Sequence, residues 1–204
     1  MILGITGGTG CGKTTLLNVL KAQGALVLDC DEIYHELLTR DKSLLAAIDA
    51  RFPGTVENGI LQRKKLGKIV FSDKNALLDL NKITHAAVKQ EVLRRLSRKP
   101  ELAAIDAIAL FEGGLAELCD VTVAVTAPVE DRVRRLMRRD GIPESYACSR
   151  IAAQPGEDWF REKCGFVLEN TGSESQFREK CLAFLQGVGI MDLGNPGGIH
   201  RRDI

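Results

Sequence analysis

The sequence predicts an α/β fold in which a five-stranded parallel sheet is covered by helices on both faces. Three observations lead to this prediction. Apolar runs of strand length alternate with helical patterns over most of the 204 residues. The first strand, helix and strand fit within about thirty residues, the length of a βαβ unit, whose two strands are parallel. The first run, MILGI, is apolar throughout, as expected of a strand that is buried on both faces of a sheet.

The five strands are expected at five apolar runs. MILGI opens the chain, and ALVLD follows the first helix and ends at Asp29. The other three runs cover residues 104–111, 120–125 and 165–170. Helical patterns fill most of the gaps between the runs, which favours parallel strands that are joined by helices.

The first helix follows a glycine-rich segment. Its apolar face is formed by Leu16, Leu17, Val19 and Leu20. Gly24 comes just after this pattern and is a suitable end for the helix, because glycine readily adopts the left-handed conformation of the residue after a helix.

Two segments are too long to be simple connections. Some seventy residues separate Asp29 from Ala104, and they contain four helical patterns but no convincing strand. We expect a helical insertion over about 31–100, which would serve as a substrate cap, and a second insertion over about 128–162. The predicted single domain is 1–187, with core segments 1–30, 101–127 and 163–187. The tail, 188–204, is rich in glycine and proline without periodicity and is expected to be loose.

Composition and charge argue against several classes of protein. The 28 Lys and Arg residues are balanced by 27 Asp and Glu residues, so the net charge of +1 gives no support for a nucleic-acid-binding protein. No apolar run approaches the ~20 residues that cross a bilayer. The first run meets glycines rather than a cleavage-like site, so we expect a cytoplasmic protein without a signal peptide. Six scattered cysteines without a CxxC pair argue against a zinc site and are expected to be reduced core thiols.

The segment GGTGCGKTT, residues 7–15, has the pattern of a phosphate-binding loop, Gly-x-x-x-x-Gly-Lys-Thr. Glycines allow several backbone N–H groups to converge on a phosphate chain, and the following helix directs its positive end at the same place. Lys13 supplies a cation for the β- and γ-phosphates, and the Thr14 hydroxyl can bind the Mg²⁺ that bridges them. The segment therefore predicts the binding of a nucleoside triphosphate.

Two absences narrow the class of phosphate-loop protein. The guanine-reading pattern Asn-Lys-x-Asp is missing, since the only Asn-Lys, at Asn81 and Lys82, is followed by Ile-Thr. The strand that ends in an Asp-Glu pair in ATPase motors is missing as well. Both absences favour a kinase for a small molecule, whose acceptor is expected near the end of a neighbouring strand.

Asp29 and Asp31 stand at the end of the second strand. A carboxylate there could accept the proton of an attacking hydroxyl or hold Mg²⁺ through water. Asp29 could instead be only the N-cap of the helix that follows. If the chain stays extended here, the two side chains point to opposite sides, and only one faces the γ-phosphate. We favour Asp31 for the functional role.

Several segments together resemble the dephospho-CoA kinase family, over residues 2 to about 187. They are, in order, LGITGGTGCGKTT, GALVLDCDEIYHELL, LNKITHAAV, AIALFEGGL, RVRRLMRRDG, RIAAQ and FREKCGFVLENTG. The resemblance implies a P-loop kinase core with a helical CoA-binding insertion over about 31–100 and a lid over about 128–162. It also implies that ATP, with Mg²⁺, phosphorylates the ribose 3′-hydroxyl of dephospho-CoA in the last step of coenzyme A synthesis.

The chain departs from the family pattern in several places. The loop reads GTGCGKT where GIGSGKS is more usual, a change that keeps the final hydroxyl. Cys30 stands between the two aspartates where alanine is usual. Ala86 follows His85 where the family commonly has proline, so the turn at His85 need not be that of the family. IALFEGG is a looser match and receives no catalytic role.

The resemblance assigns roles to individual residues. Asp31 takes the position of the general base. The residues that line the ATP phosphates are Gly10, Cys11, Gly12, Lys13, Thr14 and Thr15. His85 is a candidate contact for dephospho-CoA, although a histidine in a helical pattern is often only packed or exposed. Asn170 could reach the adenine edge of ATP, or it could be a turn residue beside Gly172.

The segment DRVRRLMRRD holds five arginines. Arg132, Arg135 and Arg139 share one helical face by i, i+3, i+7 spacing. A guanidinium that folds over ATP stabilises phosphoryl charge, and lid arginines of the family do so. Arg139 is the first candidate for this role, Arg135 the second, and Arg150 a weaker one. The alternative is a solvated helix whose arginines pair with its own aspartates.

Two other functions stay open. The protein could be another P-loop kinase, acting on a nucleoside monophosphate or a small alcohol. It could also be a regulatory module that binds a nucleotide without catalysis. Such a module needs no base at Asp31, so a change there that abolishes catalysis without loss of ATP binding would exclude it.

Overall fold

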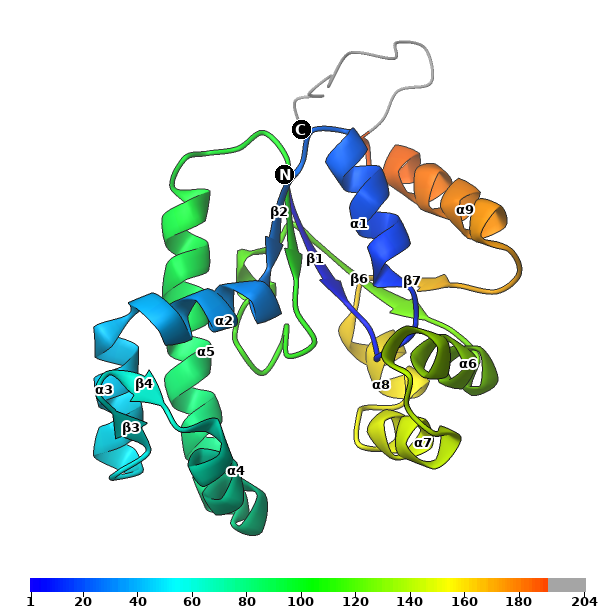
Figure 1. Cartoon of the computed structure of the whole chain (residues 1–204). Helices are drawn as coiled ribbons and strands as arrows, with labels where there is room; N and C mark the ends of the chain where they lie inside the picture. The colour runs from blue at the N-terminus through cyan, green and yellow to red at the C-terminus, as the bar shows by residue number, and fades with distance from the viewer. Residues whose placement is uncertain (191–204) are drawn as a thin grey trace. The chain divides into compact units, whose positions relative to one another are not determined.

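Five strands form one sheet in the computed structural model of the chain, which describes residues 1–190 (Figure 1). The strand order is β2-β5-β1-β6-β7. β2 pairs with β5, and β6 pairs with β7, in both cases in parallel. The predicted α/β fold, with a five-stranded parallel sheet flanked by helices, is confirmed. The strands are β1 Ile2–Thr6, β2 Leu26–Asp29, β5 Ala103–Asp106, β6 Val121–Thr126 and β7 Phe166–Glu169.

The chain divides into two compact units. The first unit comprises residues 1–4 and 26–120, and the second comprises residues 5–25 and the chain from residue 121 onward. The boundary passes through β1. The predicted division of a single domain into core, insertion and lid uses other boundaries and stays a prediction.

The first unit contains the four helices that the sequence predicts between Asp29 and Ala104. They are α2 Cys30–Arg40, α3 Lys42–Arg51, α4 Arg63–Ser72 and α5 Lys74–Leu96. Aspartates begin three of these helices, because their carboxylates accept hydrogen bonds from backbone N–H groups of the first turn. The long α5 packs against the other three helices. The core of this unit includes Ile33, Ile48, Phe52, Val92 and Ile105.

A small hairpin in the first unit was not predicted. It joins β3 Val56–Glu57 to β4 Ile60–Leu61 through a loop of two residues. The loop residues Asn58 and Gly59 have φ values of 51° and 76°. An Asn-Gly loop with both φ values positive is the turn that best fits the twist of a hairpin. The Asn-Gly pair was therefore the signal that could have identified this hairpin.

The predicted strand at 104–111 is wrong in its second half. β5 ends at Asp106, and residues 108–114 form turns that lead to a short 3-10 helix, η1 Ala116–Leu118. The N–H of Gly113 donates to the carbonyl of Ala109 at 2.8 Å. Leu110 is nevertheless fully buried. The apolar run thus reflects burial in the core and not an extended backbone, two causes that a short run does not distinguish.

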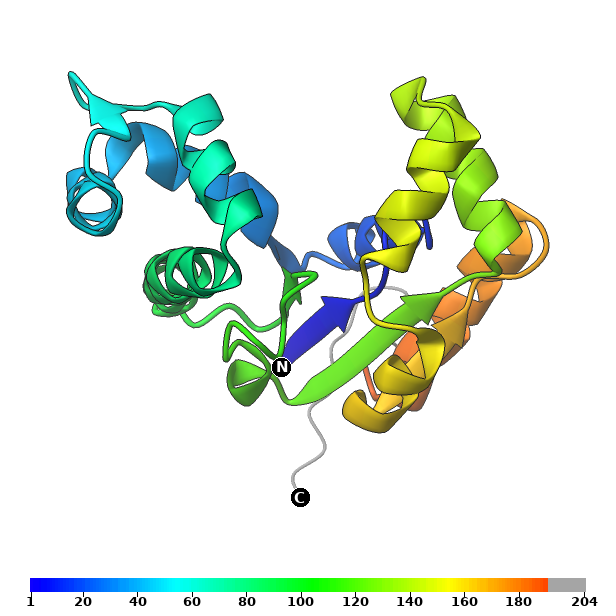
Figure 2. The same cartoon turned by 90° about the horizontal axis from the view of Figure 1, so that it is seen from below.

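The second unit contains the remaining helices, α1 Lys13–Ala22, α6 Val129–Asp140, α7 Glu144–Ala152, α8 Glu157–Lys163 and α9 Glu174–Gly187. α1 and α9 lie side by side (Figure 1), and α8 contacts β6 and β7. α6 and α7 also pack against each other (Figure 2). Their contact is an apolar cluster of Val133, Leu136, Ala147 and Ile151. Gly24 follows α1 with a φ of 80°, as its predicted role at the helix end requires.

The six cysteines are free thiols. Burial raises the pKa of Cys30 and Cys119 to about 12, so these thiols stay protonated at neutral pH. Cys148 is exposed, so the expectation of core thiols is wrong for this residue. Within residues 1–190, none of the helices combines the length and the apolar character that a membrane crossing requires. The predicted loose tail lies mostly outside the described residues.

Candidate active site

The phosphate loop connects β1 to α1 in the second unit, and its glycines are required by the shape of the backbone. Gly7 and Gly12 have φ values of 139° and 95°, which side chains rarely allow. Space is limited as well. A Cβ atom at Gly7 would lie 2.2 Å from the carbonyl oxygen of Val125, and one at Gly12 would lie 2.2 Å from Nδ2 of Asn170. The pattern that the sequence shows is therefore fixed by this local geometry.

The loop leads directly into the N-terminus of α1. Gly12 is the N-cap residue, and as a glycine it has no side chain with which to cap the helix. The partial positive charge of the helix end is thus not screened by a side chain at the N-cap position. Lys13 and Thr14 stand in the first turn, where Nζ of Lys13 donates to the carbonyl of Gly7 at 3.2 Å and Thr14 is exposed. This arrangement suits an anion that is bound by backbone N–H groups, a lysine and a hydroxyl.

Four side chains from later segments of the second unit hold loop residues 9–11. Nδ2 of Asn170 donates to the carbonyl of Cys11 at 2.8 Å. Nη1 of Arg135 donates to the carbonyls of Gly10 and Cys11, both at 3.2 Å. Arg132 and Gln154 contact Thr9. Sequence reasoning placed Arg132 on the same helical face as Arg135 but gave it no role, and it gave Gln154 no role at all.

Asn170 is buried, and its amide nitrogen is engaged by the loop backbone. Its backbone N–H donates to the carbonyl of Thr126 at 2.8 Å. The side chain thus supports the loop, and the predicted contact with adenine stays a prediction.

The arginine that was predicted first does not contact the loop. Arg139 forms an ion pair with Asp140 at 2.6 Å, and Arg150 pairs with the same carboxylate at 2.7 Å. The hydrogen bond from Arg139, together with that from Arg150, lowers the pKa of Asp140 to about 2. Arg134 pairs with Asp131. α6 therefore shows both arrangements that were expected of its arginines. Arg134 and Arg139 pair with aspartates of the helix, whereas Arg132 and Arg135 bind the phosphate loop.

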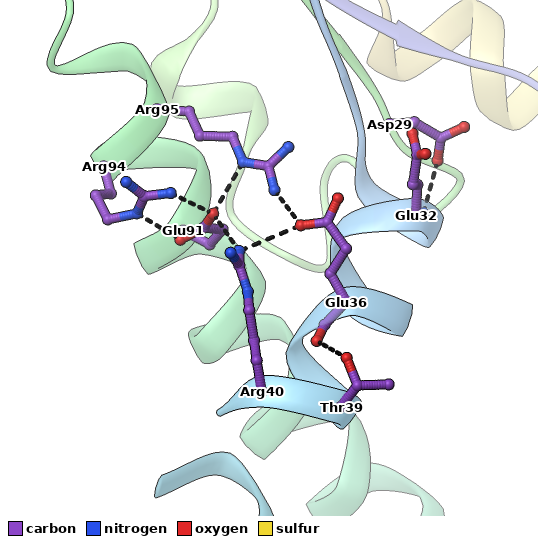
Figure 3. A network of polar contacts seen from close by, with 8 residues as sticks. All are labelled: Asp29, Glu32, Glu36, Thr39, Arg40, Glu91, Arg94 and Arg95. Atoms are coloured by element: carbon purple, nitrogen blue, oxygen red, sulfur yellow. Dashed lines mark hydrogen bonds and ion pairs between the residues drawn. The ribbon is translucent and has the colours of Figure 1, made fainter. Parts of the chain in front are cut away.

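In the first unit, Asp29 and Asp31 have different surroundings. Asp29 is the last residue of β2 and the N-cap of α2. Its Oδ1 accepts a hydrogen bond from the N–H of Asp31 at 2.9 Å and another from the N–H of Glu32 at 3.0 Å, the second of which is drawn in Figure 3. The N-cap alternative for Asp29 is thus confirmed. The condition for opposed side chains, an extended chain, is not met here, because α2 begins at Cys30 and places Asp31 in its first turn.

Asp31 and His85 line the same pocket, which has a volume of about 230 Å³. Its walls come from α2, from the middle of α5 and from the turns after β5. Tyr34, Asn81 and Thr84 add polar groups, and burial raises the pKa of the Tyr34 hydroxyl. The apolar part of the lining comes from Leu80, Val88, Ala107, Ile108, Ala109 and Leu115. The pocket therefore offers a carboxylate, an imidazole and hydrogen-bonding groups to an organic ligand with polar and apolar parts.

Comparisons with known proteins agree with these features. The family model described as dephospho-CoA kinase matches residues 1–176. A dephospho-CoA kinase from Latilactobacillus sakei is 33% identical over 191 residues, which cover 91% of this chain and 95% of the relative. A solved structure from Thermus thermophilus is 34% identical, with a TM-score of 0.79, and the match covers 92% of this chain and 97% of that one. Dephospho-CoA kinase from Campylobacter jejuni is 26% identical, with a TM-score of 0.65, and the match covers 92% and 96% of the two chains.

Proposed function

The chain belongs to the dephospho-CoA kinase family, and from this premise we propose that it transfers the γ-phosphoryl group of ATP to the ribose 3′-hydroxyl of dephospho-CoA. The products are ADP and coenzyme A, which makes the reaction the last step of coenzyme A synthesis. One observation carries the proposal. The family match over residues 1–176 includes the phosphate loop as well as Asp31 and His85.

The phosphate loop binds ATP in this proposal. Backbone N–H groups of the loop and of the first turn of α1 surround the β- and γ-phosphates, and Lys13 adds a cation. Arg135 supplies a guanidinium that already lies against the loop, as its bonds to the carbonyls of Gly10 and Cys11 indicate. Arg139 would have to leave Asp140 to take the same role. The contacts therefore favour Arg135 over Arg139 as the arginine that stabilises phosphoryl charge.

The residues at the start of α1 fit a magnesium ion that arrives with ATP. Thr14 is exposed in the first turn, and its hydroxyl is a hard oxygen ligand of the kind that Mg²⁺ accepts. Within residues 1–190, no group of three or more His, Cys, Asp or Glu residues could hold a metal ion by itself. Phosphates and water would therefore supply most ligands, with Thr14 as the protein ligand. When bound, the ion neutralises charge on the β- and γ-phosphates.

Asp31 is the general base in this proposal. It accepts the proton of the 3′-hydroxyl as the ribose oxygen forms a bond to the γ-phosphorus. The bond from that phosphorus to the β–γ bridging oxygen breaks, and ADP leaves with the electron pair. Asp29 is unsuited to the role because its Oδ1 already accepts two backbone hydrogen bonds. His85 shares the pocket with Asp31 and contacts dephospho-CoA.

Product analysis tests the proposal. The purified protein is incubated with Mg²⁺, ATP and one of several acceptors: dephospho-CoA, its analogue without the 3′-hydroxyl, a set of nucleoside monophosphates, or water alone. We expect ADP and coenzyme A to form in equal amounts with dephospho-CoA and neither to form with the analogue. Faster turnover with a nucleoside monophosphate would favour another P-loop kinase. ATP binding without any turnover would favour a regulatory module.

The setting of the reaction is part of the same proposal. All six cysteines are free thiols, a state typical of proteins in a reducing compartment. We place the enzyme in the cytoplasm, with ATP and dephospho-CoA as its partners and with no role for nucleic acid or a membrane.

A further inference from the structure

Gln154 makes two contacts that the proposed reaction does not use. Its Oε1 accepts a hydrogen bond from the backbone N–H of Thr9 at 2.7 Å and another from Nη2 of Arg132 at 3.2 Å. Both partners can only donate, so the side-chain oxygen, and not the amide nitrogen, must face them. Nε of Arg132 in turn donates to the carbonyl of Thr9 at 2.9 Å. The backbone N–H and the backbone carbonyl of Thr9 are thus both held by side chains, an arrangement that we call the Thr9 clasp.

The loop sequence is adapted to this clasp. Gly8 is not one of the glycines that the phosphate-loop pattern requires, and its φ lies outside the left-handed region. A Cβ atom at Gly8 would, however, lie 2.2 Å from Nη2 of Arg132 and 3.2 Å from Oε1 of Gln154. The guanidinium occupies the space that a side chain at this position would need. Gly8 is thus required by the space that the clasp occupies and not by the phosphate-loop pattern.

The two side chains of the clasp come from α6 and from the turn after α7, two helices that pack against each other. Arg132 precedes Val133 in α6, and Gln154 follows closely after Ile151 in α7, and both of these apolar residues belong to the cluster that joins the two helices. The N–H of Gln154 also donates to the carbonyl of Ile151 at 3.1 Å. The α6–α7 pair therefore fixes where both polar groups lie.

The guanidinium of Arg132 keeps its charge beside the loop. It has no carboxylate partner among residues 1–190, unlike Arg134, Arg139 and Arg150 in the same pair of helices. Burial lowers its pKa from the ordinary value, but an arginine stays protonated at neutral pH. A positive charge that is half-buried and unpaired favours a polyphosphate on the adjacent loop.

We propose that Gln154 and Arg132 are positioning residues for ATP. They hold the Thr9 peptide so that the N–H groups that follow it, from Gly10 onward, converge on the phosphates. The α6–α7 pair thereby sets the shape of the phosphate loop through two side chains. This inference rests on the ATP binding of the proposed function, but it does not depend on the identity of the acceptor.

A double-mutant cycle on ATP binding tests the clasp. Gln154→Met keeps the side-chain length but removes the acceptor oxygen, and Gly8→Ala places a methyl group where the Arg132 guanidinium now lies. The dissociation constant for ATP is measured by calorimetry without acceptor. Each change should weaken ATP binding about tenfold, the effect of losing one or two hydrogen bonds. The double variant should bind ATP almost as tightly as the more strongly affected of the two single variants, because both changes break the same clasp.

Four further measurements separate positioning from a general loss of structure. Gly156→Ala is the matched control, because a Cβ atom there meets nothing within 4 Å. It should leave ATP binding unchanged. The KM for dephospho-CoA and the melting temperature of the Gln154→Met variant should also stay close to those of the wild type. Gln154→Glu keeps the acceptor oxygen but adds a negative charge, so its ATP affinity should approach that of the wild type as salt is raised.

The clasp is refuted if Gln154→Met binds ATP as the wild type does, or if the two changes are additive and weaken binding about a hundredfold. Equal losses of ATP affinity and acceptor affinity would make Gln154 a purely structural residue. If Gln154→Met fails to fold, Gln154→Glu provides the test instead. An ATP affinity of this variant that does not approach that of the wild type as salt is raised would then refute the clasp. A failure to phosphorylate dephospho-CoA would overturn the proposed function and leave this test intact, because the cycle measures ATP alone.

Discussion

Two groups of arginines in this molecule have different partners. In the first unit, Arg40, Arg94 and Arg95 surround the carboxylate of Glu91, and Arg40 and Arg95 also reach Glu36 (Figure 3). In the second unit, two arginines of α6 donate to backbone carbonyls of the phosphate loop. Among residues 1–190, neither of these two has a carboxylate partner.

The difference shows what each group of arginines contributes. The side chain of Glu91 is only 8% exposed, and hydrogen bonds from Arg94, then Arg95 and Arg40, lower its pKa to about 2 against the opposing effect of burial. The pairs of Arg40 with Glu91 and of Arg95 with Glu36 join α2 to α5, and the two carboxylates offset two of the three positive charges. Within the described residues, a guanidinium that binds carbonyls of the loop has no carboxylate beside it to offset its charge, so the charge remains available to phosphate. We infer that the first group supports the fold and the second group supports binding.

Asp29 and Asp31 also differ in whether their carboxylates serve the fold or the reaction, and a change at Asp31 should have the largest effect on activity. Asp29 is engaged by the start of α2, whereas Asp31 lines the pocket. Asp31→Asn should lower single-turnover phosphorylation of dephospho-CoA by roughly 10²–10⁴-fold, the usual contribution of a general base. ATP affinity should change little. Asp29→Asn should act mainly through stability, because an amide oxygen is still a fair N-cap.

Rapid-quench measurements on both variants, with ATP binding measured separately, check this prediction. If Asp29→Asn binds ATP but fails in the chemical step, the two roles are reversed. Full activity in both variants would exclude either carboxylate as the base.

Lys13→Ala should have the next largest effect. The lysine faces the carbonyl of Gly7 and not the core, so the variant should fold normally. Turnover should fall by roughly 10²–10³-fold, as when one donor to a developing negative charge is removed. Steady-state kinetics and circular dichroism of the same preparation check both parts. Normal turnover in a folded variant would contradict the assigned role.

Glu91→Gln tests the carboxylate-bound group of arginines. The change keeps the size of the side chain but removes the charge that three guanidinium groups contact, so the free energy of unfolding should fall by roughly 2 kcal/mol. Turnover should be unchanged. Urea unfolding of the variant and the wild type at neutral pH gives the difference, and an equal stability would show that the cluster contributes nothing net.

The same cluster predicts a dependence on pH. Folding lowers the pKa of Glu91 from 4.5 to about 2. Its contribution is therefore fully present above pH 4.5 and is lost as the pH falls toward 2. The stability difference between the wild type and Glu91→Gln should narrow over this range. A difference that stays constant would mean that Glu91 titrates normally in the folded protein.

The smallest expected effect distinguishes two arginines of α6. Arg135→Ala should weaken ATP binding about tenfold, whereas Arg139→Ala should change it by less than about threefold, because Asp140 already engages Arg139. Calorimetric titration with ATP compares the two variants directly. A larger loss for Arg139→Ala would restore the ranking that the sequence suggested.

Features with a local cause could be predicted from the sequence. The strands and the four helices of the first unit follow from apolar runs and helical periodicity, and the loop follows from a pattern of glycines whose conformations are intrinsic to that residue. The N-cap role of Asp29 is equally local. The hairpin of β3 and β4 was missed because each of its strands has only two residues. The strand predicted at 104–111 was too long because the residues after Asp106 are still partly buried but no longer extended.

Contacts between distant residues could not be predicted in this way. Helical spacing places Arg132, Arg135 and Arg139 on one face, but it does not reveal that the adjacent Asp140 engages the last of them. The bond between Thr9 and Gln154 joins residues that are 145 positions apart. No periodicity encodes such a pairing. The shared pocket of Asp31 and His85 likewise depends on how α2 packs against α5.

A crossed comparison of Arg135→Ala and Arg95→Ala tests the central claim most directly. The stability of each variant is measured by urea unfolding, and its ATP affinity by calorimetry. Arg95→Ala removes the contacts to Glu91 and Glu36 and should cost about 2 kcal/mol of stability while ATP affinity is unchanged. Arg135→Ala should show the reverse, with ATP binding about tenfold weaker and stability nearly unchanged. Two variants that lose both properties together, or that exchange these results, would contradict the division between arginines that support the fold and arginines that support binding.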